Sequence, residues 1–152
     1  MKMAVLAYLR RNNKTLMLYR NKKKNDVHLG KWNGLGGKLE KGEMPEDALK
    51  REEKEESGFL VEKAILRGVI TFPDFSQGED WFVYLYDVSD FSGKIIECNE
   101  GELHWIDDKK ITQLNMWEGD YLFFSWMKSQ RFFSAKISYR QGKLIDHCVF
   151  FY

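Results

Sequence analysis

Three glutamates, Glu52, Glu55 and Glu56, follow a run of glycines at a spacing that could hold a metal ion. Like charges one turn apart weaken an isolated helix by about 0.2–0.5 kcal/mol per pair, so a positive partner is expected among them. Carboxylate oxygens without His or Cys partners favour hard cations, and Mg²⁺ or Mn²⁺ is favoured over Zn²⁺ where water and phosphate oxygens must also bind. The alternative is a solvent-exposed face of a charged helix, which accounts for most glutamate-rich runs.

A helix over Pro45–Ser57 is expected to position these carboxylates. Proline suits the first turn, where its missing N–H costs little, and Gly58 suits the residue just past the end. At about 100° per residue, the three glutamates are expected on the same side as Ala48 and Leu49, which faces the rest of the protein. The opposite side of the helix would then carry Asp47, Lys50, Lys54 and Ser57.

The residues before this helix favour a phosphate or metal site over a solvated face. Gly34, Gly36 and Gly37 permit backbone conformations closed to other residues, so backbone groups can approach an ion or a phosphate closely. Lys38 adds a cation beside the carboxylates. This segment therefore predicts a site for a substrate that carries phosphate.

The segment resembles the signature of the Nudix hydrolases, G-x5-E-x7-R-E-U-x-E-E-x-G-U, in which U is a bulky apolar residue. At one position, Glu53, the chain departs from this signature, which has an aliphatic side chain there, and the departure concerns helix packing more than chemistry. The eight matching positions, all at the correct spacing, are Gly37, Glu43, Arg51, Glu52, Glu55, Glu56, Gly58 and Phe59.

The resemblance implies the Nudix fold, an α/β/α sandwich around a mixed β-sheet, over residues 1–152 as a single domain. It also implies hydrolysis of a nucleoside diphosphate linked to another group, with divalent ions that polarise the phosphoanhydride and activate a water molecule. Glu52 and Glu56 would be the leading metal ligands, with Glu55 as a further ligand and the Gly37 carbonyl as a contributor.

The remaining catalytic roles are also implied by the resemblance. Arg51 would orient the carboxylates, and Glu43 would support it through an ion pair. The general base varies within the family, so Glu52 or a glutamate outside the signature could serve. Glu100 is the candidate outside it, as base and as metal ligand; its alternative is an exposed carboxylate in a loop.

Two further segments, 30–38, which overlaps the start of the signature, and 114–120, resemble those of MutT-type enzymes that hydrolyse oxidised purine nucleoside triphosphates. Asn33 carries a donor and an acceptor for reading a base edge, Trp117 offers a flat face for stacking, and Asp120 could hydrogen-bond the base. The alternatives are a turn residue, a core residue and a helix cap, respectively. Some of these enzymes have two adjacent acids where this chain has Gly119 and Asp120.

Lys23 lies in a basic run, Lys22–Lys24, that is either a solvated turn or a loop that reaches substrate phosphates. None of the three histidines sits in a ligand or nucleophile pattern, so they are interpreted as structural. Cys98 and Cys148 are too few for a disulfide framework and lack metal-site spacing. The histidines are His28, His104 and His147.

Hydrophobic periodicity predicts further elements around the signature helix. A second, buried helix is expected over Asp120–Lys128, and two closing strands flank the turn at Gln141 and Gly142. The strands are expected at Met3–Arg10, Thr15–Arg20, Ala64–Phe72, Trp81–Val88, Leu103–Ile106, Phe133–Arg140 and Lys143–Tyr152.

Composition limits the classes of partner. A chain of 152 residues with 43% hydrophobic residues is long enough to bury a core. A net charge of +1 provides little electrostatic attraction for the phosphate backbone of a nucleic acid. The apolar N-terminal run is too short to cross a membrane and is not followed by a cleavage site. We therefore expect a soluble cytoplasmic protein, a monomer or homodimer, whose partner is a small nucleotide.

The resulting hypothesis is a Mg²⁺-dependent pyrophosphohydrolase acting on 8-oxo-dGTP or a related oxidised purine nucleotide. One alternative is a Nudix hydrolase of another substrate, namely a pterin triphosphate, ADP-ribose, a dinucleoside polyphosphate or a capped RNA. Another is a domain that binds a nucleotide without turnover, against which the full set of signature glutamates argues.

Overall fold

Alternating residues of the first two strands divide between two hydrophobic clusters on opposite faces of one mixed sheet. In the computed structural model, which describes residues 1–152, β1 (Lys2–Arg11) and β2 (Lys14–Arg20) form a hairpin. Leu16 and Leu18 belong to one cluster and Met17, between them, belongs to the other. Because side chains alternate between faces along a strand, both faces of the sheet are covered.

The sheet contains nine strands in the path β3-β2-β1-β6-β5-β8-β9, with β4 paired to β1 and β7 paired to β2. β1 runs parallel to β6 and β5 runs parallel to β8, whereas the other pairs are antiparallel. The other strands are β3 (Trp32–Asn33), β4 (Leu35–Lys38), β5 (Phe59–Ser76), β6 (Glu79–Gly93), β7 (Gly101–Asp107), β8 (Phe133–Arg140) and β9 (Lys143–Phe151).

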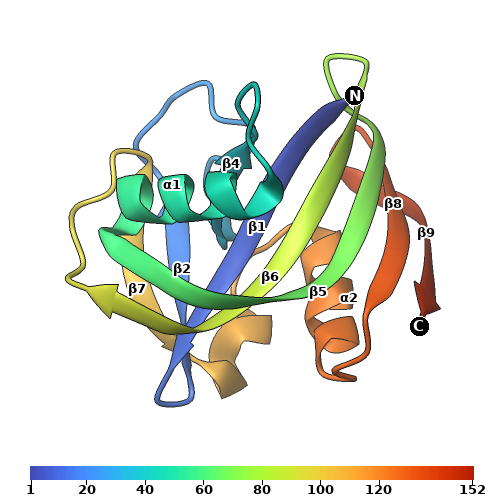
Figure 1. Cartoon of the computed structure of the whole chain (residues 1–152). Helices are drawn as coiled ribbons and strands as arrows, with labels where there is room; N and C mark the ends of the chain where they lie inside the picture. The colour runs from blue at the N-terminus through green and yellow to red at the C-terminus, as the bar shows by residue number, and fades with distance from the viewer.

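One helix covers each face of the sheet (Figure 1). α1 (Pro45–Ser57) contributes to the cluster that contains Leu16, and α2 (Glu118–Met127) contributes to the cluster that contains Met17. A short 3-10 helix, η1 (Asp108–Gln113), follows β7. This arrangement confirms the α/β/α sandwich. No helix is long and apolar enough to cross a membrane.

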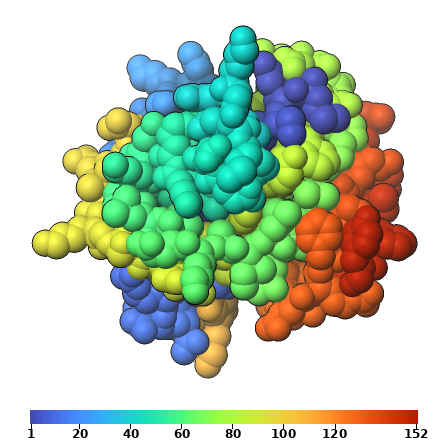
Figure 2. All heavy atoms as spheres, in the orientation of Figure 1, coloured from blue at the N-terminus to red at the C-terminus, as the bar shows by residue number.

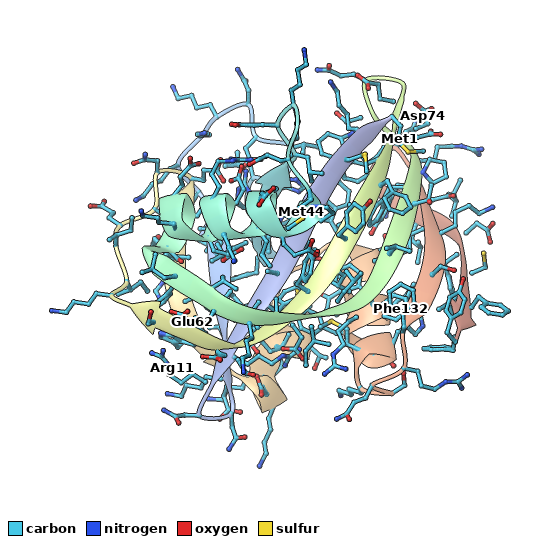
Figure 3. The ribbon with its side chains drawn as sticks, viewed as in Figure 1. Met1, Arg11, Met44, Glu62, Asp74 and Phe132 are labelled. Carbon is cyan, nitrogen blue, oxygen red and sulfur yellow. The ribbon has the colours of Figure 1, made fainter.

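The predicted bounds of the signature helix are confirmed. At its start, the carboxylate of Asp47 accepts a hydrogen bond from the Met44 N–H at 3.1 Å, and Pro45 occupies the first turn. At its end, Gly58 has φ +84°, and its N–H donates to the Lys54 carbonyl at 3.0 Å. Figure 3 marks the start of the helix at Met44, and Figure 2 shows α1 at the surface of this face.

The predicted faces of α1 are partly wrong. Glu53 and Ser57 are fully buried, whereas the Glu55 side chain is 63% exposed. Glu53 follows Leu49 by four residues and therefore lies on the same inward face, and Ser57 continues that row. The Ser57 hydroxyl donates to the Glu53 carbonyl at 2.6 Å.

The strands are present where periodicity predicts them, but β5 and β6 extend further at both ends, to Phe59–Ser76 and Glu79–Gly93. The second helix begins two residues earlier than predicted, at Glu118. The strands β3 and β4 and the helix η1 lie in segments for which no such element was predicted. All three are too short to show a periodic pattern, and two of the four residues of β4 are glycines.

Candidate active site

A cavity of about 640 Å³ brings the carboxylates of α1 together with the residues proposed to read a base. It is lined from the glycine-rich strand β4, the inward side of α1, the end of the β5–β6 hairpin and the start of α2. Of the residues singled out from the sequence, its lining includes Asn33, Gly37, Lys38, Arg51, Glu52, Glu56, Glu100, Trp117 and Asp120.

The glycines of β4 allow this strand to run directly against α1. A Cβ atom on Gly37 would lie 2.5 Å from the Glu52 carboxylate, and one on Gly36 would lie 1.9 Å from a carbonyl oxygen of β1. The Gly36 N–H donates to Glu56 Oε2 at 3.1 Å. Two carboxylates are therefore held against a half-buried backbone segment, in which a side chain at Gly36 would meet the β1 backbone and one at Gly37 would displace Glu52.

Burial and mutual repulsion raise the pKa values of these carboxylates. Burial raises the pKa of Glu56 to about 8, and the charges of Glu100 and Glu52 add to the shift. Burial also raises the pKa of Glu52, although Arg51 opposes this effect. Because the charges of Glu100 and Glu52 both raise the pKa of Glu56, this is a site that a cation would stabilise.

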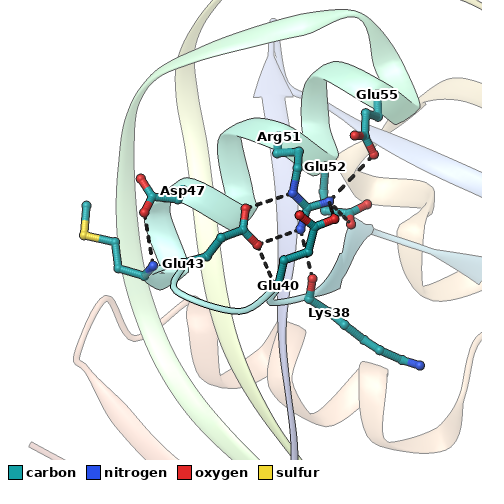
Figure 4. Close-up of polar contacts among 8 residues, drawn as sticks. Lys38, Glu40, Glu43, Asp47, Arg51, Glu52 and Glu55 are labelled. Atoms are coloured by element: carbon teal, nitrogen blue, oxygen red, sulfur yellow. Dashed lines mark hydrogen bonds and ion pairs between the residues drawn. The ribbon is translucent and has the colours of Figure 1, made fainter.

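Arg51 is the centre of an ion-pair network along α1 (Figure 4). Its Nη1 lies 2.7 Å from Glu52 Oε1, and its Nε and Nη2 each lie 2.8 Å from an oxygen of Glu43. These bonds lower the pKa of Glu43 to about 2. Glu55 lies 3.7 Å from Arg51 Nη1 but points to solvent and does not line the cavity.

Glu100 lies immediately before β7, and its side chain is 27% exposed. It lines the cavity and is therefore not the free loop carboxylate of the alternative interpretation. Arg20 Nη1 lies 3.3 Å from one of its oxygens, and Lys23 Nζ lies 3.4 Å from the other. The side chain of Lys23 is 57% exposed and does not line the cavity, whereas Lys38 does.

Asn33 and Asp120 contribute buried polar atoms to the cavity. Asn33 Oδ1 is buried and has no hydrogen-bond partner in the protein. Asp120 is 8% exposed, and burial raises its pKa to about 8. It lies within α2 rather than at its N-cap, which is Trp117, so the helix-cap interpretation is wrong.

Several residues in the cavity carry no sequence signal that marks them. Phe75 and Tyr139 pack on the Trp117 ring, with centroids 5.4 and 5.1 Å away. The Tyr139 hydroxyl accepts a hydrogen bond from the Gly119 N–H at 2.7 Å. It lies 2.6 Å from the position that a Cβ on Gly119 would occupy. The other unmarked lining residues include Arg20, His28, Phe72, Trp81 and Phe123.

The side chains alone do not form a ready-made ion cluster, because no three His, Cys, Asp or Glu groups converge tightly. The oxygen-only donor set around Glu52, Glu56 and the Gly37 backbone nevertheless suits a hard cation that also binds water and phosphate oxygens. Repulsion between Glu52, Glu56 and Glu100 is the observation that favours such an ion. The residues present therefore fit a divalent metal.

A family model described as the NUDIX domain matches residues 1–127. The chain belongs to the Nudix family. The oxidized purine nucleoside triphosphate hydrolase of Danio rerio is 36% identical over 126 residues, covering 82% of this chain and 81% of that protein. The Mus musculus protein of the same name is 30% identical over 123 residues, covering 81% and 79%.

A solved Nudix-fold structure, a MutT protein from Bacillus halodurans, superposes with a TM-score of 0.86 over 98% of this chain and 97% of that one, at 23% identity. At this identity the match concerns the fold. The protein is therefore a Nudix hydrolase of the MutT fold, and members of this family generally use divalent metal ions and act on small nucleotides.

Proposed function

We propose that this Nudix hydrolase is a Mg²⁺-dependent pyrophosphohydrolase that acts on 8-oxo-dGTP or a related oxidised purine nucleotide, releasing the monophosphate and pyrophosphate. The observation that carries the proposal is the pair of buried polar groups in the cavity, Asn33 Oδ1 without a partner and the Asp120 carboxyl. Buried polar atoms without partners are costly, so a ligand is expected to satisfy them.

Oxidation of guanine at C8 converts N7 from a hydrogen-bond acceptor into an N–H donor. A free acceptor such as Asn33 Oδ1 therefore suits the oxidised base better than the ordinary one. Because the pKa of Asp120 is about 8, its carboxyl is largely protonated at neutral pH and can both donate and accept. Trp117 and Phe75 provide apolar walls for a flat ring system.

The phosphate chain would extend towards α1. Mg²⁺, or Mn²⁺ in its place, would be held by Glu52, Glu56 and the Gly37 carbonyl, with Glu100 as a further ligand. Glu55 would join them only after its exposed side chain turned towards the cavity. When bound, such an ion neutralises phosphate charge and acidifies a water molecule. Arg51 fixes Glu52, Lys38 attracts the phosphates, and Glu52 or Glu100 accepts the proton of the attacking water.

The relatives in fish and mouse bear the name of this activity, which supports the same substrate class here. We treat residues 1–152 as one domain because β8 extends the sheet and its Tyr139 lines the cavity. We expect the enzyme to work in the cytoplasm on free nucleotides, as a monomer or homodimer, without a stable nucleic-acid partner.

The test is a steady-state comparison of kcat/KM for 8-oxo-dGTP, dGTP, ADP-ribose and a dinucleoside polyphosphate with Mg²⁺, with identification of the phosphate products. One to two additional hydrogen bonds predict a preference for 8-oxo-dGTP over dGTP of about 5- to 100-fold. A flat profile, or a higher value for a substrate without an oxidised purine, would contradict the proposal.

Two variants test the two halves of the site separately. Asn33→Ala should raise KM for 8-oxo-dGTP much more than KM for dGTP, because it removes the acceptor. Glu56→Gln should lower kcat for every substrate, because it removes a carboxylate expected to hold the ion. Unchanged hydrolysis by Glu56→Gln would show that the metal-site assignment is wrong.

A further inference from the structure

A continuous chain of hydrogen bonds and ion pairs joins Trp117 in the base-binding part of the cavity to Glu100 near the carboxylates of α1. The Trp117 indole N–H donates to His28 Nδ1 at 2.8 Å. The His28 backbone N–H donates to Asp26 Oδ1 at 3.0 Å, and Arg20 Nε donates to Asp26 Oδ2 at 2.7 Å. Arg20 Nη1 lies 3.3 Å from Glu100 Oε2.

The inner members of this chain are shielded from solvent, which makes the contacts stronger than surface pairs. The side chains of Asp26 and Arg20 are only 5% and 16% exposed. The segment that contains them is also closed at its base, because the Gly30 N–H donates to the Arg20 carbonyl at 2.7 Å. The loop from Arg20 to Gly30 is therefore held as one unit beside the cavity.

His28 contacts more than the indole N–H. Its ring stacks on Phe75 at 6.4 Å with an interplanar angle of 24°, and meets the Trp117 ring edge-on at 5.8 Å. Burial and the nearby Arg20 lower the pKa of His28 to about 4, so the imidazole is neutral at neutral pH and Nδ1 can accept a hydrogen bond. The contacts hold the Trp117 indole in one orientation.

We infer that His28 is a positioning residue that sets the Trp117 indole for the nucleotide base, and that Asp26 and Arg20 connect this support to Glu100. The inference rests on the proposed function only in taking Trp117 as a wall of the base-binding cavity. A base that stacks on Trp117 would therefore favour the position of the Arg20–Gly30 loop in which Arg20 contacts Glu100. Arg20 contacts the carboxylates of both Asp26 and Glu100, and the Asp26 carboxylate accepts hydrogen bonds from both Arg20 and His28.

A double-mutant cycle tests the first step. His28→Leu keeps an apolar side chain but removes the acceptor, and Trp117→Phe keeps an aromatic ring but removes the donor. His28→Leu is expected to raise KM for the best nucleotide substrate about tenfold, with less than a twofold change in kcat. In a protein that already carries Trp117→Phe, adding His28→Leu should change KM less than twofold. Equal effects in both backgrounds would overturn the inference.

His28→Asn provides the rescue, because its Oδ1 can accept near the position of the imidazole Nδ1. It should restore KM to within about threefold of the starting protein, whereas a purely space-filling role for His28 would leave Asn as impaired as Leu. The dissociation constant of the monophosphate product, measured by calorimetry, gives the same comparison for any variant whose turnover is too slow.

Asp26→Ala tests the connection to Glu100. It should raise both KM for the nucleotide and the Mg²⁺ concentration for half-maximal activity, each about three- to tenfold. Asn25→Ala, an exposed neighbour in the same loop, is the matched control and should change both less than twofold. An effect of Asp26→Ala on KM alone, or on neither quantity, would overturn the connection to Glu100, whereas the role of His28 is decided by the double-mutant cycle.

These outcomes are separable from the substrate proposal. The double-mutant cycle is measured with whichever nucleotide the protein hydrolyses best. If that nucleotide has no oxidised purine, the proposed function is refuted, but the cycle still tests the role of His28. An additive cycle with a clear 8-oxo-dGTP preference refutes only the role of His28. Thermal unfolding of each variant excludes loss of fold as the cause.

Discussion

Replacing Glu53 with Leu should stabilise the protein, because this carboxyl is buried without a partner. The residue has no exposed surface, and both carboxylate oxygens lack hydrogen bonds. Burying such a polar group costs about 1–3 kcal/mol in proteins. At pH 5 we expect Glu53→Leu to gain about 2 kcal/mol, which for a domain of this size raises Tm by about 4–8 °C.

The gain should increase with pH. Burial raises the pKa of Glu53 well above its ordinary value of 4.5, so the folded protein keeps the proton that the unfolded chain releases above that pH. The stability of the starting protein therefore falls as pH rises above about 4.5, by up to about 1.4 kcal/mol per pH unit from this group. From pH 5 to pH 7 the advantage of Leu should grow by up to about 3 kcal/mol.

The assay is denaturant unfolding of both proteins at pH 5 and pH 7. Glu53→Gln separates the two effects, since it keeps the unpaired polar atoms but removes the pH dependence. Lys50→Leu, on the exposed side of α1, controls for the helix preference of Leu and should change stability by less than about 0.5 kcal/mol. A Glu53→Leu gain that is absent, or equal at both pH values, would refute the reasoning.

Other predictions concern the site. Gly37→Ala should reduce kcat in a steady-state assay, because its Cβ would meet the Glu52 carboxylate at 2.5 Å and displace it; activity within about twofold of the starting protein would show that the Glu52 side chain adjusts without loss of function. Gly119→Asp should impair activity, and Tyr139→Phe should restore it only in part, because the new Cβ would lie 2.6 Å from the Tyr139 hydroxyl and 2.9 Å from Ile137 Cγ2; equal kcat/KM values for the single and double variants would argue against a clash with the hydroxyl. Because the pKa of Glu56 is about 8, the Mg²⁺ concentration for half-maximal activity should fall as pH rises from 6.5 to 9, when the carboxylate loses its proton. A flat profile over that range would remove Glu56 from the ion site.

The signature helix was predictable because its limits are local. Pro45 and Gly58 define its ends through backbone preferences that act within one turn. Which side of it is buried depends on the sheet, and that is why Glu55 was wrongly placed on the inward side and Ser57 on the outer side. The short strand β4 escaped prediction for a related reason, since Gly36 is explained by the neighbouring β1 backbone and Gly37 by the Glu52 carboxylate.

The carboxylates of α1 that line the cavity could be predicted from residue spacing within one segment, whereas most of its aromatic lining residues could not. Phe75 and Tyr139 come from distant strands, and nothing in their own neighbourhoods marks them as cavity residues. His28 was interpreted as structural because a histidine without a patterned partner gives no signal. Its partner, Trp117, is 89 positions away in the chain.

The closing hairpin gives the last part of the chain an influence on substrate choice that is independent of the chemistry. Tyr139 lies on β8, beyond residue 127 where the family match ends, yet it packs on Trp117 and lines the cavity. A mutation in this hairpin could alter one wall without touching any signature residue. Descendants of such a protein could acquire new substrates by varying this hairpin, while the machinery for breaking the phosphoanhydride is inherited intact.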